Sequence, residues 1–320
     1  MSRKTAWAWG RLAGSALVLA VLVWRLGTGP FVEGVRTVDA QVLAEAAAIT
    51  VLTTVCCGWR WKIVAGGLGI ELSLPAAVAA CYRAQFLNLT LPGGIVGDVH
   101  RGVRHGRDVR DVGRALRAVA WERSAGQVVQ TVLTVIVLLA LPSPVRSSMP
   151  VVAVGVVLAG LAVVLALRTR PGGGRSVLAR VRTVAIRDIR DALLARRAWP
   201  AIVLASVVVV LGHATTFMIA ARTAGATASP TEMLPLALLA MTGMVLPSAG
   251  GWGPREGVTA WAFAAAGLGA QRGVTTAVVY GVIVFVACLP GAAVLVVAWF
   301  RRNRLPERGQ RQLRESAAHA

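Results

Sequence analysis

The hydrophobic positions of this chain form long runs that are separated by short, arginine-rich segments. Six runs approach the roughly 20 residues that a membrane-spanning helix needs. They cover residues 7–26, 38–59, 119–141, 150–167, 200–221 and 274–300. The pattern predicts an all-α polytopic membrane protein with about six full spans.

Two further apolar regions, residues 76–91 and 233–268, are interrupted by breaks rich in glycine and proline. The residues that break them are Pro92, Gly93, Gly94 and Gly97 in the first region and Pro247, Gly250, Gly251 and Gly253 in the second. Lipid cannot hydrogen-bond an opened backbone, so a broken helix needs cover from protein or a watery cavity. One such break in each half predicts the binding site of a transporter.

The distribution of charge predicts how the chain is oriented. The net charge is +20, and nine arginines lie between Arg168 and Arg197 alone. Residues 101–117 and the segment after Phe300 are also rich in arginine. By the positive-inside rule, these segments and both termini face the cytoplasm of a multi-pass protein in the plasma membrane. The same rule explains the basic excess without nucleic acid as a partner.

Orientation also constrains the two broken regions. Residues 76–91 lie between two cytoplasmic segments, which favours a re-entrant or half-buried helix. Residues 233–268 lie between two outside segments and form either a re-entrant pair or two tightly paired spans. A span, a broken element and a second span thus occur twice in opposite orientation, which predicts an inverted repeat suited to alternating access. The alternative is two unrelated packing breaks.

Composition predicts one membrane domain, residues 1–300, and a basic, disordered cytoplasmic tail, residues 301–320. The cysteines lie in or beside apolar runs and are interpreted as packing residues. Neither a Walker A motif nor a zinc motif occurs, so we predict no cofactor, no metal site and no catalytic residues. These features favour a transporter over an enzyme.

Arg255 and Glu256 follow the second break inside an apolar region. Ionisable residues at membrane depth are costly and usually face a cavity or each other. Arg255 is a candidate to bind a lipid phosphate, because its planar fork donates two parallel hydrogen bonds. Glu256 would position Arg255 or exchange a proton. The alternative is a self-neutralising pair that holds the break together.

Asp98 and Arg101 follow the first break. A helix that starts there would favour an anion at its exposed N–H groups, although Asp98 could instead cap the helix. Arg101, Arg104, Arg107 and Arg110 recur every three residues beside apolar positions. This spacing predicts an amphipathic segment on the anionic inner leaflet.

Three more charged residues are candidates for contact with substrate. Glu122 and Arg123 lie just inside the run 119–141, where an ion pair, local or between helices, is the alternative. Arg83 lies in the short region 76–91 and would reach a headgroup or extend to water.

Three stretches resemble the signatures of a known family. Residues 86–98, FLNLTLPGGIVGD, with Arg101 after them, resemble the first signature of the lysylphosphatidylglycerol synthase transmembrane-region family, a flippase-like domain. Residues 122–126, ERSAG, resemble its acidic-Arg…Gly element, and residues 246–257, LPSAGGWGPREG, resemble its second signature. The resemblance implies an integral membrane protein that moves or handles lipids or lipid-linked groups between leaflets. The candidate arginines predict that these membrane lipids carry anionic or phosphate-bearing headgroups.

The resemblance does not extend to aminoacyl transfer. Full-length synthases of this family carry a soluble transferase domain after the membrane part, whereas 20 residues follow Phe300 here. The sequence therefore favours translocation of a lipid or lipid-linked group. The alternatives are a membrane-embedded transferase that acts on a lipid phosphate, with Asp98 or Glu256 as base, and a non-catalytic membrane partner of a separate transferase.

Overall fold

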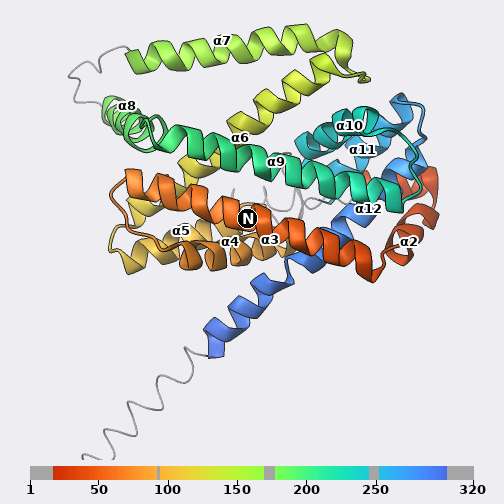
Figure 1. The fold of residues 1–320 in the computed structure, drawn as a ribbon, viewed down its shortest axis with the longest axis horizontal. Coiled ribbons are helices and arrows are strands. Elements are labelled where there is room, and N and C mark those ends of the chain that lie inside the picture. Colours follow the sequence, from red (N-terminus) through yellow and green to blue (C-terminus); the bar gives the residue numbers. More distant parts are fainter. Residues whose placement is uncertain (1–16, 92–93, 169–176, 245–251, 301–320) are drawn as a thin grey trace, which may run out of the picture.

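The computed structural model describes residues 17–91, 94–168, 177–244 and 252–300, which are mostly helical (Figure 1). Within these residues, 5 helices are long and apolar enough to cross a membrane. They are Ala40–Gly67, Val112–Ala140, Arg146–Ala166, Ala198–Thr223 and Ala270–Phe300. The prediction of an all-α polytopic membrane protein is confirmed, and five of the six predicted runs correspond to these helices.

The helices are named as in Figure 1. In chain order they are α2 (Gly29–Arg36), α3 (Ala40–Gly67), α4 (Leu74–Thr90), α5 (Val96–Asp108), α6 (Val112–Ala140), α7 (Met149–Arg168), α8 (Val177–Asp188), α9 (Ala198–Thr223), α10 (Pro230–Gly243), α11 (Pro254–Ala265) and α12 (Ala270–Ala287). A 3₁₀ turn (Arg146–Ser148) precedes α7, and a π-helical turn (Ile189–Leu193) follows α8.

Polar residues at the helix starts explain several of these boundaries. The Asp39 carboxylate accepts a hydrogen bond from the Val42 N–H at 2.8 Å and caps α3. Asp111 does the same for α6, accepting from the Arg114 N–H at 2.9 Å. Such caps satisfy N–H groups that have no partner within the helix. They mark where the long apolar helices α3 and α6 begin.

The structure describes only the second part of the first predicted span. Of residues 7–26 it describes 17–26, which form the helix Leu17–Leu26, and this helix meets α2 at 97° just beyond the predicted run. The bend follows from Gly27, whose φ is +76°, and from Pro30 at the start of α2. Both residues favour a chain that leaves the helix axis. The described residues therefore contain 5 candidate spans, or up to 6 if this bent pair counts as one.

The helices form two structural repeats, α3–α6 and α9–α12. In each repeat a long helix is followed by two short helices packed on each other, and then by a second long helix. The contacts of the two leading helices correspond: α3 packs on α4, α6 and α12, while α9 packs on α10, α12 and α6. Helices α3 and α9 form the most extensive contact and lie side by side (Figure 1). This pattern is that of a two-fold repeat.

The two repeats are inverted relative to each other. Val64, near the end of α3, packs with Ile202 near the start of α9. Ala46, near the start of α3, shares a core cluster with Ala220 near the end of α9. The two helices are therefore antiparallel, and the short helices that follow them enter the bundle from opposite ends.

The short helices have the lengths expected of re-entrant elements. Helices α10 and α11 contain 14 and 12 residues. At 1.5 Å per residue they measure about 21 and 18 Å, against about 30 Å for the hydrocarbon core of a bilayer. Of the two arrangements expected for residues 233–268, length thus favours the re-entrant pair over two spans.

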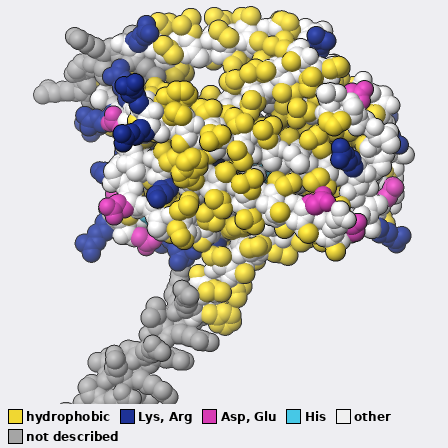
Figure 2. All heavy atoms as spheres, viewed as in Figure 1, with side chains coloured by type: hydrophobic (Ala, Val, Ile, Leu, Met, Phe, Trp, Pro, Cys, Tyr) yellow, Lys and Arg dark blue, Asp and Glu magenta, His cyan; other side chains and the backbone are white. Residues whose placement is uncertain are grey.

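The surface carries a hydrophobic band between two polar ends. Figure 2 shows Lys and Arg side chains gathered mainly at one end, on the left in this view, around α8. Exposed apolar side chains cover the long helices, and on α7 they include Val151, Val157 and Leu158. Such a band is the surface that lipid tails cover.

The predicted amphipathic segment that carries Arg101, Arg104, Arg107 and Arg110 extends beyond the end of a helix. Helix α5 ends at Asp108, and Arg110 adopts a φ of +59° between α5 and α6. A Cβ on Gly106 would lie 2.4 Å from the Cα of Val112, so the absence of a side chain lets α5 and α6 pack closely. Arg101 consequently faces the protein interior instead of the membrane surface, with 3% of its surface exposed.

Candidate functional site

Five charged side chains from α3, α5 and α6 form a connected cluster, which we call the ion network. Arg60 donates to one oxygen of Glu122 (Nε to Oε1, 2.8 Å), and Arg101 donates to the other at 2.5 Å. Arg101 also donates through Nε to Oδ1 of Asp98 at 3.0 Å, and Arg123 donates to Oδ2 of Asp98 at 2.5 Å. Three guanidinium groups thus share two carboxylates, which leaves one excess positive charge.

Neighbouring groups hold the guanidiniums of the ion network in place. Arg60 donates to Oγ of Ser206 on α9 at 2.9 Å, which ties the network to the second repeat. The Arg101 guanidinium lies 4.6 Å from the centroid of the Trp61 ring. A Cβ on Gly126 would lie 2.8 Å from Nη1 of Arg60, so only glycine leaves room for this guanidinium.

The first hairpin, formed by α4 and α5, closes at Gly97. A Cβ on Gly97 would lie 2.0 Å from the carbonyl oxygen of Ala84. The Gly97 N–H donates to Oδ1 of Asn88 at 2.7 Å, and Asn88 Nδ2 donates to Oδ2 of Asp98 at 2.9 Å. Asp98 is not the cap of α5, since Ile95 occupies that position. Its carboxylate faces Arg101 and Arg123 instead.

Members of the ion network differ in exposure. Glu122 is 1% exposed, whereas the Arg123 side chain is 52% exposed. Burial by itself lowers the pKa of the Arg101 guanidinium, but attraction to Glu122 and Asp98 outweighs burial and raises the pKa above its ordinary value. Arg101 therefore stays charged, and Arg123 is the member that a molecule outside the network can reach most readily.

A second charged cluster lies at the start of α11. Arg255 and Glu256 are both buried and form an ion pair in which Arg255 Nε donates to Glu256 Oε1 at 3.0 Å. The other Glu256 oxygen accepts from the Gly253 N–H at 2.6 Å and so satisfies the helix start. The Arg255 guanidinium lies 4.9 Å from the Trp252 ring and 5.6 Å from the Tyr280 ring. The self-neutralising pair that the sequence left as the alternative is present, and cation–π contacts accompany it.

A polar contact lies beside the second charged cluster. The Arg255 guanidinium lies over the Tyr280 ring, and the Tyr280 hydroxyl lies 3.3 Å from Nδ1 of His213 on α9. Tyr280 and His213 therefore link the surroundings of Arg255 to the long helix that begins the second repeat.

The structure brings together most of the residues singled out in the sequence. Asp98, Arg101, Glu122 and Arg123 meet in the ion network, and Arg255 pairs with Glu256, whereas Arg83 lies outside both clusters. Gly94 and Gly253 have φ values of +64° and +96°, as sharp turns require. The remaining break residues lie outside the described residues: Pro92, Gly93, Pro247, Gly250 and Gly251.

Sequence analysis missed three members or supports of the ion network: Arg60, Asn88 and Ser206. Ending the second span at residue 59 placed Arg60 in a cytoplasmic segment, but α3 continues to Gly67 and Arg60 is 4% exposed. The run Ile63–Val64–Ala65 after Arg60 was the available signal that the helix continues.

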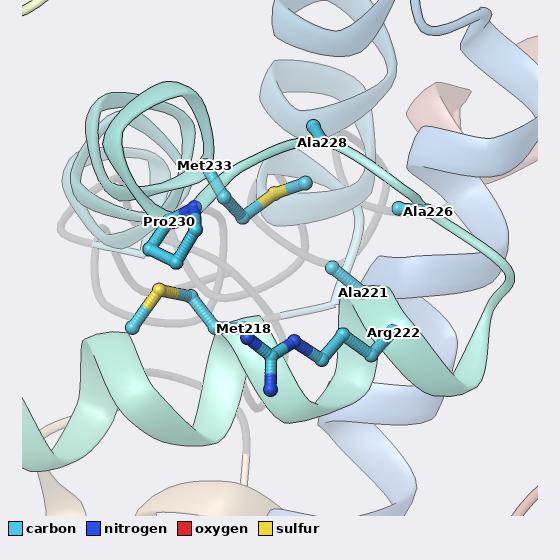
Figure 3. Close-up of a pocket in the computed structure, with 7 residues that line it drawn as sticks. All are labelled: Met218, Ala221, Arg222, Ala226, Ala228, Pro230 and Met233. Carbon is cyan, nitrogen blue, oxygen red and sulfur yellow. The ribbon is translucent and has the colours of Figure 1, made fainter.

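A shallow recess lies apart from both clusters (Figure 3). It encloses about 210 Å³ of empty space, open solvent included, between the end of α9 and the start of α10. Its lining is mostly apolar and includes Arg222 and Met218. None of the charged candidates from the sequence lines it.

Comparison with known proteins bears on the function. The family model described as the lysylphosphatidylglycerol synthase TM region matches residues 8–291. No curated protein matches the chain. The family match includes every residue of the ion network and of the Arg255–Glu256 pair.

Proposed function

The chain belongs to the lysylphosphatidylglycerol synthase TM region family, and from this premise we propose that it translocates a lipid or lipid-linked group between leaflets. Membership indicates an integral membrane protein linked to lipid handling and associated with membrane lipids. The group moved is proposed to carry an anionic, phosphate-bearing headgroup.

The observation that carries the proposal is the exposed Arg123, which pairs with Asp98 of the first hairpin. Its guanidinium can bind a phosphate through two parallel hydrogen bonds. The ion network has one excess positive charge, which an incoming anion would neutralise. Asp98 would keep Arg101 and Asn88 as partners if Arg123 turned to the phosphate. Exchange of partners would therefore leave no buried carboxylate unpaired.

From Arg123 the headgroup is proposed to pass toward the second hairpin. There the Tyr280 hydroxyl and His213 would offer hydrogen-bonding groups beside Arg255. Arg255 and Glu256 would receive the headgroup after the bundle opens toward the other end. Inverted repeats support alternating access, because the two hairpins enter the bundle from opposite ends. The lipid tails would stay in the bilayer throughout.

Substitution of Arg123 tests the proposal. We expect Arg123→Gln to lose most leaflet exchange in proteoliposomes while remaining folded, because its side chain is largely exposed. Arg114→Gln is the matched control: it lies on the same helix, pairs with Asp111 and is 45% exposed, against 52% for Arg123. Exchange of labelled phosphate-bearing lipids is scored per folded molecule. Normal exchange by Arg123→Gln would contradict the proposed role of this residue.

Orientation in the plasma membrane is a separate part of the proposal, with the termini and α8 on the cytoplasmic side. We expect a Val181→Cys variant in a cysteine-free background to resist an impermeant thiol reagent in intact cells. A Thr227→Cys variant, at the opposite end between α9 and α10, should react. Both residues are exposed on the protein surface, so a difference in labelling reports the side of the membrane and not burial in the protein. The reverse labelling pattern would show that α8 faces the outside, which contradicts the proposed orientation.

A further inference from the structure

Arg83 on α4 has an unusual environment for a charged side chain. It is 9% exposed, and its Nε atom is enclosed without a hydrogen-bond partner. Among the described residues, no carboxylate forms an ion pair with it. A buried charge without a partner is costly, and proteins usually pair it. Arg83 is therefore a buried cation without an ion-pair partner among the described residues.

A second arginine adds to the unpaired positive charge of the first hairpin. Arg104 lies on α5, which packs against α4. Burial and the charge of Arg104 lower the pKa of Arg83, while Asp108 acts in the opposite direction. No ion pair involves Arg104 within the described part of the chain. Two like charges on adjacent helices repel unless an anion lies between them. The pair forms a cationic position in the first hairpin.

This position is distinct from the ion network. Cys81, two residues before Arg83, accepts a hydrogen bond from Arg101 at 3.5 Å and so marks the face of α4 that meets the network. Two residues correspond to about 200° around a helix. Arg83 consequently projects from another face, and the terminal guanidinium nitrogens, unlike Nε, are not enclosed. An anion could reach these nitrogens without entering the network.

We propose that Arg83 and Arg104 form a phosphate-binding site in the first hairpin, separate from the ion network. Two guanidinium groups on adjacent helices supply the directed donors that a phosphate accepts. The phosphate comes either from a lipid headgroup at the protein surface or from free phosphate in the adjoining water. Binding at this site requires no translocation.

Thermal unfolding of the purified protein in uncharged detergent tests the site. One series adds inorganic phosphate against sodium chloride of equal ionic strength, and another adds phosphatidylglycerol against diacylglycerol. The variants are Arg83→Gln and Arg104→Gln, with Arg107→Gln as control, since Arg107 is an exposed arginine on the same helix. All are repeated in the Arg123→Gln background. In this background, anion binding at Arg83 and Arg104 is measured independently of any role of Arg123 in leaflet exchange. The proposed function and the proposed phosphate site can therefore fail separately.

We expect the wild type and Arg107→Gln to be stabilised by phosphate, by phosphatidylglycerol or by both. In Arg83→Gln and Arg104→Gln the affinity should fall about ten- to a hundredfold, the range for losing a charged hydrogen bond. Without added anion, Arg83→Gln should unfold at no lower temperature than the wild type, because an unpaired buried cation is removed. Stabilisation by phosphatidylglycerol alone assigns the site to lipid headgroups, and stabilisation by inorganic phosphate extends it to free phosphate. Absence of stabilisation by either, or equal stabilisation in all three variants, overturns the proposal.

Discussion

A Glu122→Gln protein is expected to lose most of its folded population. Glu122 is 1% exposed and accepts hydrogen bonds from both Arg60 and Arg101. Glutamine has nearly the same shape, but its amide has no charge and offers an N–H₂ group to one of the two guanidiniums. Removing one partner of a buried ion pair costs about 3–5 kcal/mol, because the other charge stays buried without compensation. Here two cations lose the same partner.

The measurement is the monodisperse fraction in size-exclusion chromatography and the unfolding temperature in detergent. Glu45→Gln is the matched control, because Glu45 also lies on a long apolar helix but is exposed and contacts Gln41 instead of an arginine. We expect the control to match the wild type in both measurements. Equal unfolding temperatures for the two variants would show that the ion network does not hold α3, α5 and α6 together.

Gly97→Ala is expected to prevent the first hairpin from closing. An added Cβ would lie 2.0 Å from the Ala84 carbonyl oxygen, a distance that only movement of the backbone can relieve. Overpacking costs about 1–3 kcal/mol where side chains can adjust, and here the obstacle is main chain. Opening the hairpin would also break the hydrogen bond from the Gly97 N–H to Asn88. Asp98 would then move away from Arg101 and Arg123.

Gly66→Ala provides the control for this substitution. A Cβ there meets no atom within 4 Å, and the residue lies in α3. Alanine in a helix is favoured over glycine by about 1 kcal/mol, so the control should be as stable as the wild type or more so. Yield of folded protein and leaflet exchange per folded molecule are the measurements. A Gly97→Ala protein that folds and exchanges lipid normally would contradict the close approach of α4 and α5.

The sequence by itself determined the membrane class, most of the long helices and the position of the two broken regions. Residues 200–221 were predicted as a span, and α9 covers Ala198–Thr223. Such predictions succeed because the length and hydropathy of a run are local properties that lipid selects directly. Three motifs in order also identified the family, as the match over residues 8–291 confirms.

The tertiary structure decided which charges meet. Arg60 and Glu122 are 62 residues apart in sequence, and their pairing depends on how α3 and α6 are rotated and packed. Hydropathy favoured ending the span before Arg60, because two charges close together, Arg60 and Lys62, resemble the start of a loop. Burial of that charge is favourable only when Glu122 and Ser206 face it, and those residues come from other helices. A pairing between distant helices leaves no periodic signal along the chain, so only the packed bundle shows it.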